Sequence, residues 1–440
     1  MTAPSTVIIG AGLSGLSCAY HLDGNYALLE RENEPGGMVR TTMRLNRFLC
    51  DGTGHWLHLR NPGMKELVYR LLDGQLVEYE RKAVIYSQGV FTLFPFQANT
   101  YGLPREVVLE CLLGLLKARH PEDFGLQAPA SPPTSFRDWI ERYFGMGIAR
   151  YFMVPYNEKL LGVSLDELRP EYAERFIPRP SIEDVLKGAL GFSRELLGYN
   201  ARFVYPRTGG IGSLARAFAK ALPVAPRYGC AATVVDIPGR ALTLSTGERL
   251  SFKQLVNTMP LTTLIRLCQG LPREVQEASS KLRATTVHYF DLGVRGPSDM
   301  ASDYHWIYFP EPEFIFYRAG SYSAVHKGAA PDGCRSYYVE LSGDRAGLLK
   351  QPEALKARVL SDLKRVRVIS ERDEILFMEL CQIPQAYVVF DKNYEAAREV
   401  VLDYLADQGI KSIGRWGGWN YGGMEDAMLD GKRAAEALKA

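Results

Sequence analysis

The sequence of 440 residues predicts an α/β fold in which one domain is built on a parallel sheet and carries two inserted segments. Three observations support this prediction. A short apolar run at the N-terminus leads into a glycine-rich turn and a helical pattern, a second strand and helix follow near the C-terminus, and the middle changes from helical to strand periodicity. A chain of this length is expected to form two or three domains.

The first element is the stretch TVIIGAGLSGLSCAYHL, where a β-branched run leads into Gly10, Gly12 and Gly15 and then into a helical pattern. Such a turn presents backbone N–H groups and the positive end of a helix to a pyrophosphate, and its third glycine lets helix and strand approach closely. This is the pattern of a Rossmann-like dinucleotide-binding domain. A purely structural glycine turn is the alternative.

The second strand, YALLE, ends on Glu30, where a carboxylate can accept hydrogen bonds from both hydroxyls of a ribose and disfavours a 2′-phosphate. The next stretch, EPGGMVRT, resembles the second glycine turn of FAD enzymes in the glutathione-reductase-like and amine-oxidase-like group. This resemblance favours FAD over NAD. We therefore expect Glu30, Arg31, Gly37 and Met38 to line the cofactor.

The far end of the chain is expected to complete the cofactor domain. GIKSIGRWGGWNYGGMEDAMLDGKRAAEAL gives a short strand, a glycine-rich turn with Gly414 and Arg415, and a helix from about Met424. We expect Arg415 to pair with the pyrophosphate, and the start of the helix, with Met424 and Glu425, to face the pyrimidine edge of the flavin. A surface arginine and an ordinary helix cap are the alternative.

The middle of the chain predicts two different segments. PREVVLECLLGLLKARH and SFRDWIERYFGMGIARYFMVPYNEKLLG have helical spacing, so residues 104–195 are expected to be mostly helical. The proline-rich residues 121–135 between them predict an exposed loop, and whether it is a lid stays open. The expected domains are an FAD-binding domain over 1–85, 205–260 and 376–440, a mainly helical substrate or lid domain over 86–204, and an antiparallel β-sheet substrate domain over 261–375.

The composition limits the classes of partner that the protein is expected to bind. The formal charge of +2 comes from 52 basic and 50 acidic residues, so no net field favours nucleic acid or a membrane surface, and anion binding must be local. No apolar run approaches the roughly 18 residues of a spanning helix, and the N-terminus lacks the pattern of a secretory signal. Seven scattered cysteines without a CxxC pair favour reduced thiols in a cytoplasmic protein.

Eight blocks along the chain resemble those of UDP-galactopyranose mutases, especially the eukaryotic type. They are GTGHWLHLRN, LFPFQAN, VPYNEKLLG, ERFIPR, YNARFVYPRTGGIGSL, HWIYFPEPEFIFYRA, AYVVF and GRWGGWNYGGMED. The resemblance implies an isomerase that interconverts the pyranose and furanose forms of a UDP-galactose-like sugar. In that family N5 of reduced FAD attacks the anomeric carbon, and UDP leaves and later returns. Reduced FAD is therefore the implied cofactor, with NAD(P)H as one candidate reductant.

The resemblance also assigns site residues. Arg175 and Arg318 would bind the diphosphate, since guanidinium forks suit phosphate oxygens, together with the phenols of Tyr308, Tyr387 and Tyr421. An ion pair for Arg175, a buried partner for Arg318 and core positions for the tyrosines are the alternatives. Contacts to uridine, ribose and sugar would come from Phe94, Gln97, Asn99, Asn157, Leu161 and Asn200.

This sequence departs from the family pattern near the expected sugar. Leu161 stands where the family usually has tryptophan, and Gly422 and Gly423 stand where it usually has polar or acidic side chains. Both changes could widen the pocket or alter hydroxyl contacts. The identity of the sugar therefore stays open even if the mutase assignment holds.

The block CDGTGHWLHLRNP contains His55 and His58. In the family the equivalent block lies against the isoalloxazine, so Gly54 and His55 are expected near flavin N5. His58 is either a second site residue or a core histidine. No metal is expected, because neither CxxC nor HExxH accompanies the pair.

Three classes of function compete. The first is the flavin-dependent nucleotide-sugar mutase. The second is an FAD-dependent oxidoreductase of the protoporphyrinogen oxidase, desaturase or amine oxidase type, which shares both FAD blocks but needs an apolar cavity or an aromatic cage. The third is a flavin-binding scaffold without catalysis. The two arginines and three tyrosines favour the mutase, with a small-molecule partner and an open oligomeric state.

Overall fold

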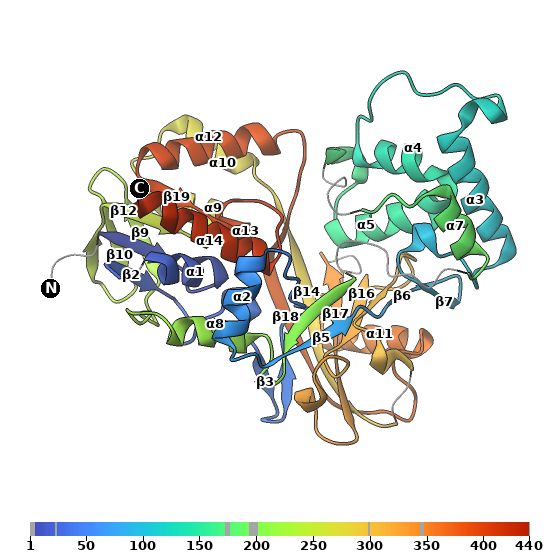
Figure 1. Ribbon diagram of the computed structural model, residues 1–440, viewed down its shortest axis with the longest axis horizontal. Helices are drawn as coiled ribbons and strands as arrows, with labels where there is room; N and C mark the ends of the chain where they lie inside the picture. The colour runs from blue at the N-terminus through green and yellow to red at the C-terminus, as the bar shows by residue number, and fades with distance from the viewer. Residues whose placement is uncertain are drawn as a thin grey trace.

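The computed structural model describes residues 5–22, 24–171, 177–192, 201–297, 300–343 and 347–439. Figure 1 shows a parallel sheet with its helices on the left, and a long antiparallel sheet with a helical segment above it on the right. Both ends of the chain lie at the left edge of the view. The half with the parallel sheet thus takes strands from both ends of the sequence and one strand from residues 254–257.

The parallel sheet has the strand order β19-β12-β1-β2. All three neighbouring pairs are parallel. Strand β12 lies between β1, the first strand of the chain, and β19, the last strand, and pairs with both. A parallel sheet must be covered on both faces, which explains the continuous apolar run in the first strand. The strands are β1 (Thr6–Ile9), β2 (Tyr26–Leu29), β12 (Gln254–Asn257) and β19 (Ile410–Ser412).

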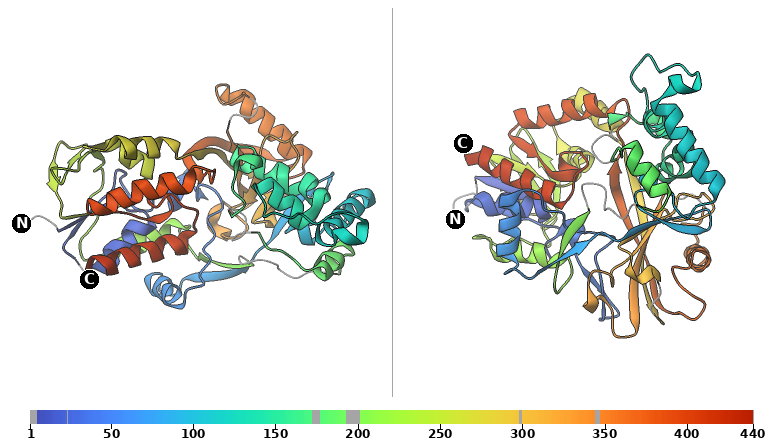
Figure 2. Two further views of the ribbon diagram at one scale, coloured as in Figure 1. Left: turned by 90° about the horizontal axis from the view of Figure 1, so that it is seen from above. Right: turned by 45° about the vertical axis from the view of Figure 1, so that its right-hand side comes forward.

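Alternate side chains of these strands enter two different cores. Ile8 and Val256 pack with α1, α8 and α14, whereas Val7, Ile9 and Leu255 pack with α9, α10 and α12. This division follows from the two-residue period of a strand. Figure 2 shows the sheet between these helices. The helices are α1 (Leu13–Leu22), α8 (Gly212–Lys220), α9 (Leu261–Leu267), α10 (Arg273–Lys281), α12 (Tyr394–Asp407) and α14 (Met424–Lys439).

The large sheet has the strand order β18-β14-β17-β16-β15-β6-β7. Its pairs are antiparallel except for β15 with β6, which is parallel. The antiparallel sheet expected in the second half of the chain is therefore present and gains two strands from the first hundred residues. The strands are β6 (Ala83–Ser87), β7 (Val90–Leu93), β14 (Ala284–Arg295), β15 (Trp306–Tyr308), β16 (Arg318–Ser321), β17 (Cys334–Ser342) and β18 (Glu374–Val388).

The expected helical segment lies above this sheet in Figure 1. Its first two helices cross where Gly114 meets Gly145 and Gly147, so closely that a Cβ on Gly145 would lie 2.1 Å from the backbone of Gly114. The proline-rich stretch 121–135 is an exposed loop with one short turn, as predicted. The helices are α3 (Arg105–Arg119), α4 (Phe136–Ile148), α5 (Val154–Leu161) and α7 (Ile182–Ala189).

The elements differ in places from the expected boundaries. Helices α9 and α10, at 261–281, pack on the parallel sheet because their apolar faces complete its core. Strand β7 belongs to the large sheet through its hairpin with β6, although it lies inside 86–204. After residue 230 the chain forms a hairpin of β9 (Ala232–Asp236) with β10 (Ala241–Leu244), in a small sheet with β11 (Arg249–Ser251) and β13 (Cys268–Gln269).

Smaller elements connect these parts. Two antiparallel ladders lie between the cofactor half and the large sheet: β3 (Thr42–Arg44) with β4 (Phe48–Cys50), and β5 (Leu76–Glu80) with β8 (Arg202–Pro206). All seven cysteines are free. Over the described ranges, no helix is long and apolar enough to cross a membrane, and no cluster of three His, Cys, Asp or Glu side chains could hold a metal.

Lys159 joins helix α5 to the large sheet. Its buried ammonium donates to the carbonyls of Phe309, Glu311 and Phe316 at 2.8, 2.9 and 2.6 Å. We expect Lys159→Met to lower the free energy of unfolding by about 3 kcal/mol, because three buried carbonyls lose a charged donor. Urea denaturation measures the loss, with exposed Lys220→Met as control. An unchanged midpoint for Lys159→Met would show that water replaces the ammonium without cost.

Candidate functional site

The N-terminal glycine turn is shaped by two close approaches and one open position. A Cβ on Gly10 would lie 2.4 Å from Oγ1 of Thr258, and one on Gly15 would lie 1.9 Å from the carbonyl oxygen of Gly10. Around Gly12 nothing lies within 4 Å of such a Cβ. The backbone is therefore bare at Gly12, beside the start of α1, which is the arrangement that a pyrophosphate requires.

Glu30 fixes the neighbouring strand end. Its buried carboxylate accepts hydrogen bonds from the backbone N–H groups of Ala11 (2.8 Å) and Glu32 (3.0 Å). The carboxylate therefore sits directly beside the glycine turn, where a ribose would lie. Arg31 differs from its neighbour: its side chain is 74% exposed and pairs with Glu32 at 3.1 Å.

The second glycine turn is tied to the first. The N–H of Gly36 donates to the carbonyl of Ala11 at 2.8 Å, and a Cβ on Gly37 would lie 3.4 Å from Cα of Gly12. Gly37 (φ +55°) and Met38 form the start of a short 3₁₀ turn. The two glycine turns thus face one another over the open position, as an FAD site of the predicted kind requires.

The C-terminal turn brings Arg415 toward the tyrosines. Its guanidinium donates to the carbonyls of Ala386 (2.7 Å) and Gly422 (3.3 Å) and lies 4.7 Å from the ring centre of Tyr421 and 5.3 Å from that of Tyr387. Within the described chain, its buried Nε has no hydrogen-bond partner. That N–H remains available to an anionic ligand.

The two other C-terminal positions have different surroundings. Gly414 adopts a φ of +76° and leaves only 2.2 Å between a Cβ and Oγ of Ser14, so it permits close packing on α1. Met424 is half-buried at the start of α14.

The side chain of Glu425 has backbone partners that the sequence did not indicate. Its buried carboxylate accepts from the backbone N–H groups of Arg60 (2.6 Å) and Asn61 (2.7 Å), just before helix α2 (Pro62–Leu71). The carboxylate is therefore occupied in holding the start of α2. The sequence pattern could not show this, because the partners lie more than 360 residues away.

Arg318 has a buried partner, which was the alternative considered for it, and that partner is the carboxylate of Glu340. Its Nε and Nη2 donate to the two carboxylate oxygens of Glu340 at 3.0 and 2.7 Å, and Nη2 lies 3.3 Å from the hydroxyl of Tyr387. The hydroxyl of Tyr317 also donates to Glu340. Burial is the largest single effect and lowers the pKa of Arg318, but the carboxylate of Glu340 together with the phenols of Tyr387, Tyr156 and Tyr317 outweighs burial and raises the pKa well above the ordinary value. The result is a permanently charged guanidinium with a fixed orientation.

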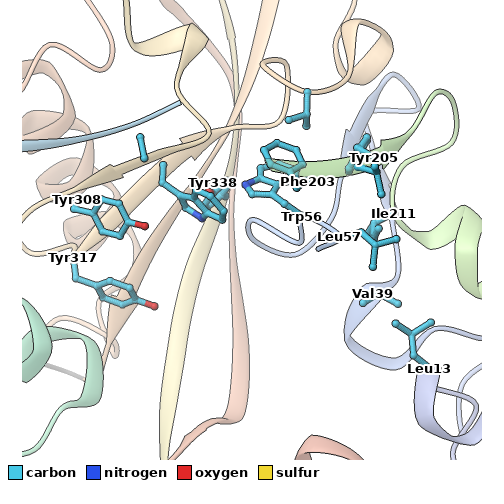
Figure 3. Close-up of a cluster of buried hydrophobic side chains, with 14 of the residues drawn as sticks. Leu13, Val39, Trp56, Leu57, Phe203, Tyr205, Ile211, Tyr308, Tyr317 and Tyr338 are labelled. Carbon is cyan, nitrogen blue, oxygen red and sulfur yellow. The ribbon is translucent and has the colours of Figure 1, made fainter. Parts of the chain in front are cut away.

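Phenols surround this guanidinium. The ring of Tyr308 stacks on Phe94 at 4.8 Å, and Tyr156 meets Tyr308 edge-on at 5.3 Å. Burial raises the pKa of Tyr308 and Tyr421, so both hydroxyls stay protonated donors at neutral pH. Figure 3 shows Tyr308 and Tyr317 at one end of a buried cluster that runs past Trp56 to Leu13 and Val39 beside the glycine turns.

Two residues of this region were missed by the sequence analysis. Tyr156 precedes Asn157 in the quoted block VPYNEKLLG, and its ring lies 6.3 Å from that of Tyr317. The buried guanidinium of Arg81 lies 4.7 Å from the ring centre of Phe94. Its place directly before Asn157 within that block was the available signal for Tyr156. Nothing in the local sequence marked Arg81.

The predicted amide contacts are partly engaged within the protein. The amide nitrogens of Gln97, Asn99 and Asn157 donate to the carbonyls of Pro178 (3.1 Å), Pro95 (3.2 Å) and Met153 (2.7 Å). Each of these three amide nitrogens is thus bonded to a main-chain carbonyl of the protein itself. Leu161 is buried in the core at the end of α5. Arg175 and Asn200 lie outside the described residues.

His55 lies close enough to Arg318, Glu340 and Arg415 for their charges to act on its imidazole. Its Nδ1 is 2.9 Å from the carbonyl oxygen of Asp51. Burial lowers the pKa of His55 and the hydrogen bond to Asp51 raises it; among the smaller effects, Glu340 raises this pKa whereas Arg415 and Arg318 lower it. The imidazole is therefore neutral at pH 7.

The neighbours of His55 have structural positions. A Cβ on Gly54 would lie 2.5 Å from the hydroxyl of Tyr338 and 2.9 Å from Nε1 of Trp306, so only glycine fits there. His58 instead bonds the carbonyl of Arg202 through Nδ1 at 2.9 Å and meets Phe203 edge-on. Of the two histidines, His55 lies within reach of the charges of Arg318 and Glu340, whereas His58 packs against Phe203.

A second buried histidine predicts acid sensitivity. Burial lowers the pKa of His305 to about 3, and its Nδ1 accepts from the N–H of Lys82 at 3.0 Å. Below the unfolded pKa of about 6.5 only the unfolded chain binds this proton, so the stability due to His305 is lost as pH falls. The loss is about 2 kcal/mol between pH 7 and pH 5. Burial raises the pKa of Asp51 to about 6, which acts in the opposite direction below that pH.

A substitution at His305 tests how much this side chain contributes to the pH dependence of stability. His305→Gln keeps an acceptor and should show a free energy of unfolding that depends less steeply on pH between 7 and 5 than that of the original protein. Denaturant unfolding at several pH values measures this, and exposed His120→Gln is the control. Equal slopes for His305→Gln and the original protein would contradict a depressed pKa at His305.

Comparison with known proteins places this geometry in a family. A family model described as flavin containing amine oxidoreductase matches residues 13–439. A crystal structure of reduced UDP-galactopyranose mutase is similar with a TM-score of 0.93 and 26% identity, covering 100% of this chain and 94% of that one. A proposed protoporphyrinogen oxidase from Exiguobacterium sp. 255-15 is similar with a TM-score of 0.75 and 18% identity, covering 100% and 99%. A putrescine oxidase redesigned in its cofactor binding has a TM-score of 0.66 and 17% identity, covering 99% and 98%.

Proposed function

The chain belongs to the family of flavin-containing amine oxidoreductases, and within it we propose a flavin-dependent mutase that interconverts the pyranose and furanose forms of a UDP-galactose-like nucleotide sugar. The similarity to the reduced mutase supports this reading over the whole chain. The similarities below 25% identity support the fold alone. FAD is the cofactor that the family and the two facing glycine turns favour.

The observation that carries the proposal is the fixed guanidinium of Arg318 among phenols. A leaving diphosphate develops negative charge, and a preoriented guanidinium stabilises such charge better than mobile water does. Glu340 holds the fork by two hydrogen bonds, which leaves Nη1 without an acceptor among the described residues. The free N–H groups of Arg318 can therefore turn to phosphate oxygens, with Tyr308 and Tyr387 as further donors.

Each residue has a definite task in this scheme. Reduced FAD, when bound, supplies the nucleophile for the anomeric carbon. Arg318 and the phenols hold the diphosphate while the bond to the sugar is broken and remade. His55, neutral and protonated at Nδ1, offers Nε2 as a hydrogen-bond acceptor beside the reacting centre.

One observation favours the oxidoreductase alternative. The rings of Tyr387 and Tyr421 lie nearly parallel, 6.0 Å apart at 20°, as the walls of an aromatic cage for an amine would. The guanidinium of Arg415 already lies 4.7 and 5.3 Å from these ring centres. A fixed cation against both rings opposes a second, ammonium cation, so the cage fits an anionic ligand better.

The deciding experiment is an anaerobic conversion. Purified protein is reduced with dithionite or NAD(P)H, UDP-galactofuranose is added, and the UDP-sugars are resolved by chromatography. We expect the pyranose form only after reduction. If the reduced protein neither converts the sugar nor binds UDP, the mutase proposal is wrong and amine or porphyrinogen oxidation becomes the reaction to assay. UDP binding without conversion would retain the class and point to another sugar.

His55→Ala tests the contact to the flavin. We expect turnover to fall by about two orders of magnitude, because a positioned hydrogen-bond acceptor is lost beside the reacting centre. The rate of flavin reduction should change in the same variant. Stopped-flow absorbance at the flavin band measures it, with His58→Ala as the matched control. A reduction rate and turnover equal to those of the original protein would remove His55 from the site.

A further inference from the structure

The loop from Asp51 to His55 has a backbone that needs external support. Gly52 has a φ of +61° and Thr53 a φ of +100°. A β-branched residue in that region costs about 1–3 kcal/mol and persists only where surrounding groups hold it. The loop that carries His55 is therefore not at its local minimum, and its contacts decide where the imidazole points.

One support acts on the middle of the loop. The N–H of Thr53 donates to the hydroxyl of Tyr322 at 2.9 Å, and that hydroxyl donates to the buried carboxylate of Asp291 at 3.0 Å. Arg44 pairs with the same carboxylate at 3.0 Å. The carboxylate at the end of this support is paired with a cation, so the negative charge of the buried Asp291 is compensated by Arg44.

The other support is the side chain of Asp51, which is 1% exposed. Its Oδ1 accepts from Oγ1 of Thr41 (2.6 Å) and from the N–H of Ile211 (3.3 Å), immediately before helix α8, and its Oδ2 accepts from the hydroxyl of Tyr205. Among the described residues no lysine, arginine or histidine pairs with it. Burying a carboxylate without a cation is costly, so a purely structural role would be served better by a neutral group.

The main chain of the same residue contacts the imidazole. The carbonyl oxygen of Asp51 lies 2.9 Å from Nδ1 of His55. A carbonyl oxygen can only accept, so Nδ1 carries the proton, and in a neutral imidazole Nε2 then carries a lone pair. The side chain of Asp51 thus anchors the peptide group that selects the tautomer of His55.

We propose that Asp51 is a positioning residue: its buried carboxylate, held by Thr41, Tyr205 and the start of α8, fixes the loop so that His55 keeps its proton on Nδ1 and presents Nε2 as an acceptor. Its effect on turnover rests on the proposed function. The tautomer itself concerns only His55 and holds for any reaction at this site.

The test is a two-bond ¹⁵N–¹H spectrum of the FAD-bound protein labelled with [¹⁵N]histidine, in which His55→Ala identifies the His55 signals. We expect the Nδ1–H tautomer in the original protein, and in Asp51→Ala the Nε2–H tautomer as the major form. If Asp51→Ala does not fold, Tyr205→Phe removes one of the three supports and should move the same equilibrium in the same direction. Val359→Ala creates a cavity in the core on the far side of the large sheet. This variant controls for a general loss of stability and should leave the tautomer of His55 unchanged.

A kinetic measurement separates the positioning role of Asp51 from the proposed mutase reaction. If the mutase proposal holds, kcat of the folded Asp51 or Tyr205 variant should fall about tenfold while KM for the UDP-sugar stays within about twofold. An Nε2–H tautomer in the original protein, or an unchanged tautomer in the folded variants, would overturn the proposal. A shifted tautomer in a protein that converts no UDP-sugar would support it and reject only the mutase reaction.

Discussion

Replacing Arg318 by alanine is expected to lower turnover by about three orders of magnitude while FAD stays bound. Two hydrogen bonds to the carboxylate of Glu340 hold this guanidinium in a fixed orientation within the tyrosine cluster. Its loss leaves the developing charge of the diphosphate without that group. The glycine turns that are expected to bind FAD follow strands of the parallel sheet, whereas Arg318 lies on a strand of the large sheet. The absorbance spectrum of the bound flavin should therefore persist in the variant. Single-turnover kinetics on the reduced protein measure the loss, and UDP titration should show weaker binding as well.

Stability must be separated from chemistry in this variant. Removing the arginine leaves Glu340 buried without its partner, which costs about 3–5 kcal/mol. Arg335→Ala is the matched control, because Arg335, which like Glu340 is on strand β17, forms a buried ion pair with Asp373. It should lose similar stability and keep turnover. Arg318→Lys keeps the charge but not the fork and should recover only part of the rate. Turnover that remains normal in Arg318→Ala would remove this residue from the diphosphate site.

The cofactor half was predictable because its signals are local. Gly10, Gly12 and Gly15 stand between a strand and a helix, and Glu30 ends the next strand, so spacing alone predicts which backbone faces the ligand. The strand and helix at the C-terminus were predictable for the same reason. The family model and the strand order of the parallel sheet agree with this part of the prediction.

The remaining site depends on pairs that no local pattern marks. Glu340 reads as one acid in an apolar strand until the register places it opposite Arg318. Lys159 reads as an exposed helix residue until three carbonyls of a distant hairpin are seen around it. Glu425 stands at a helix start that is expected to face the flavin, and only the structure shows that its carboxylate holds the start of α2. Each case is a contact between segments far apart in sequence, where periodicity carries no information.

The glycine turn gives a prediction that separates packing from cofactor binding. Gly15→Ala would place a methyl group 1.9 Å from the carbonyl oxygen of Gly10, so strand β1 and helix α1 must move apart. We expect the protein without FAD to lose about 3 kcal/mol of unfolding free energy, with weaker FAD binding as a consequence of the displaced helix. Denaturant unfolding of the apoprotein measures the first effect and flavin fluorescence titration the second.

Gly12→Ala should behave in the opposite way. Nothing lies within 4 Å of the added methyl group, and the residue does not adopt a positive φ, so the apoprotein should keep its stability within about 0.5 kcal/mol. The methyl group would occupy the bare position that faces the second glycine turn, and FAD affinity should fall by about a hundredfold because the pyrophosphate cannot approach the backbone. Gly63→Ala, at the start of α2 with only an ordinary contact to Asn61, is the control that should change neither quantity. If Gly12→Ala binds FAD as tightly as the original protein, the pyrophosphate does not lie at this turn, and the stability of the apoprotein would show that the fold is not the reason.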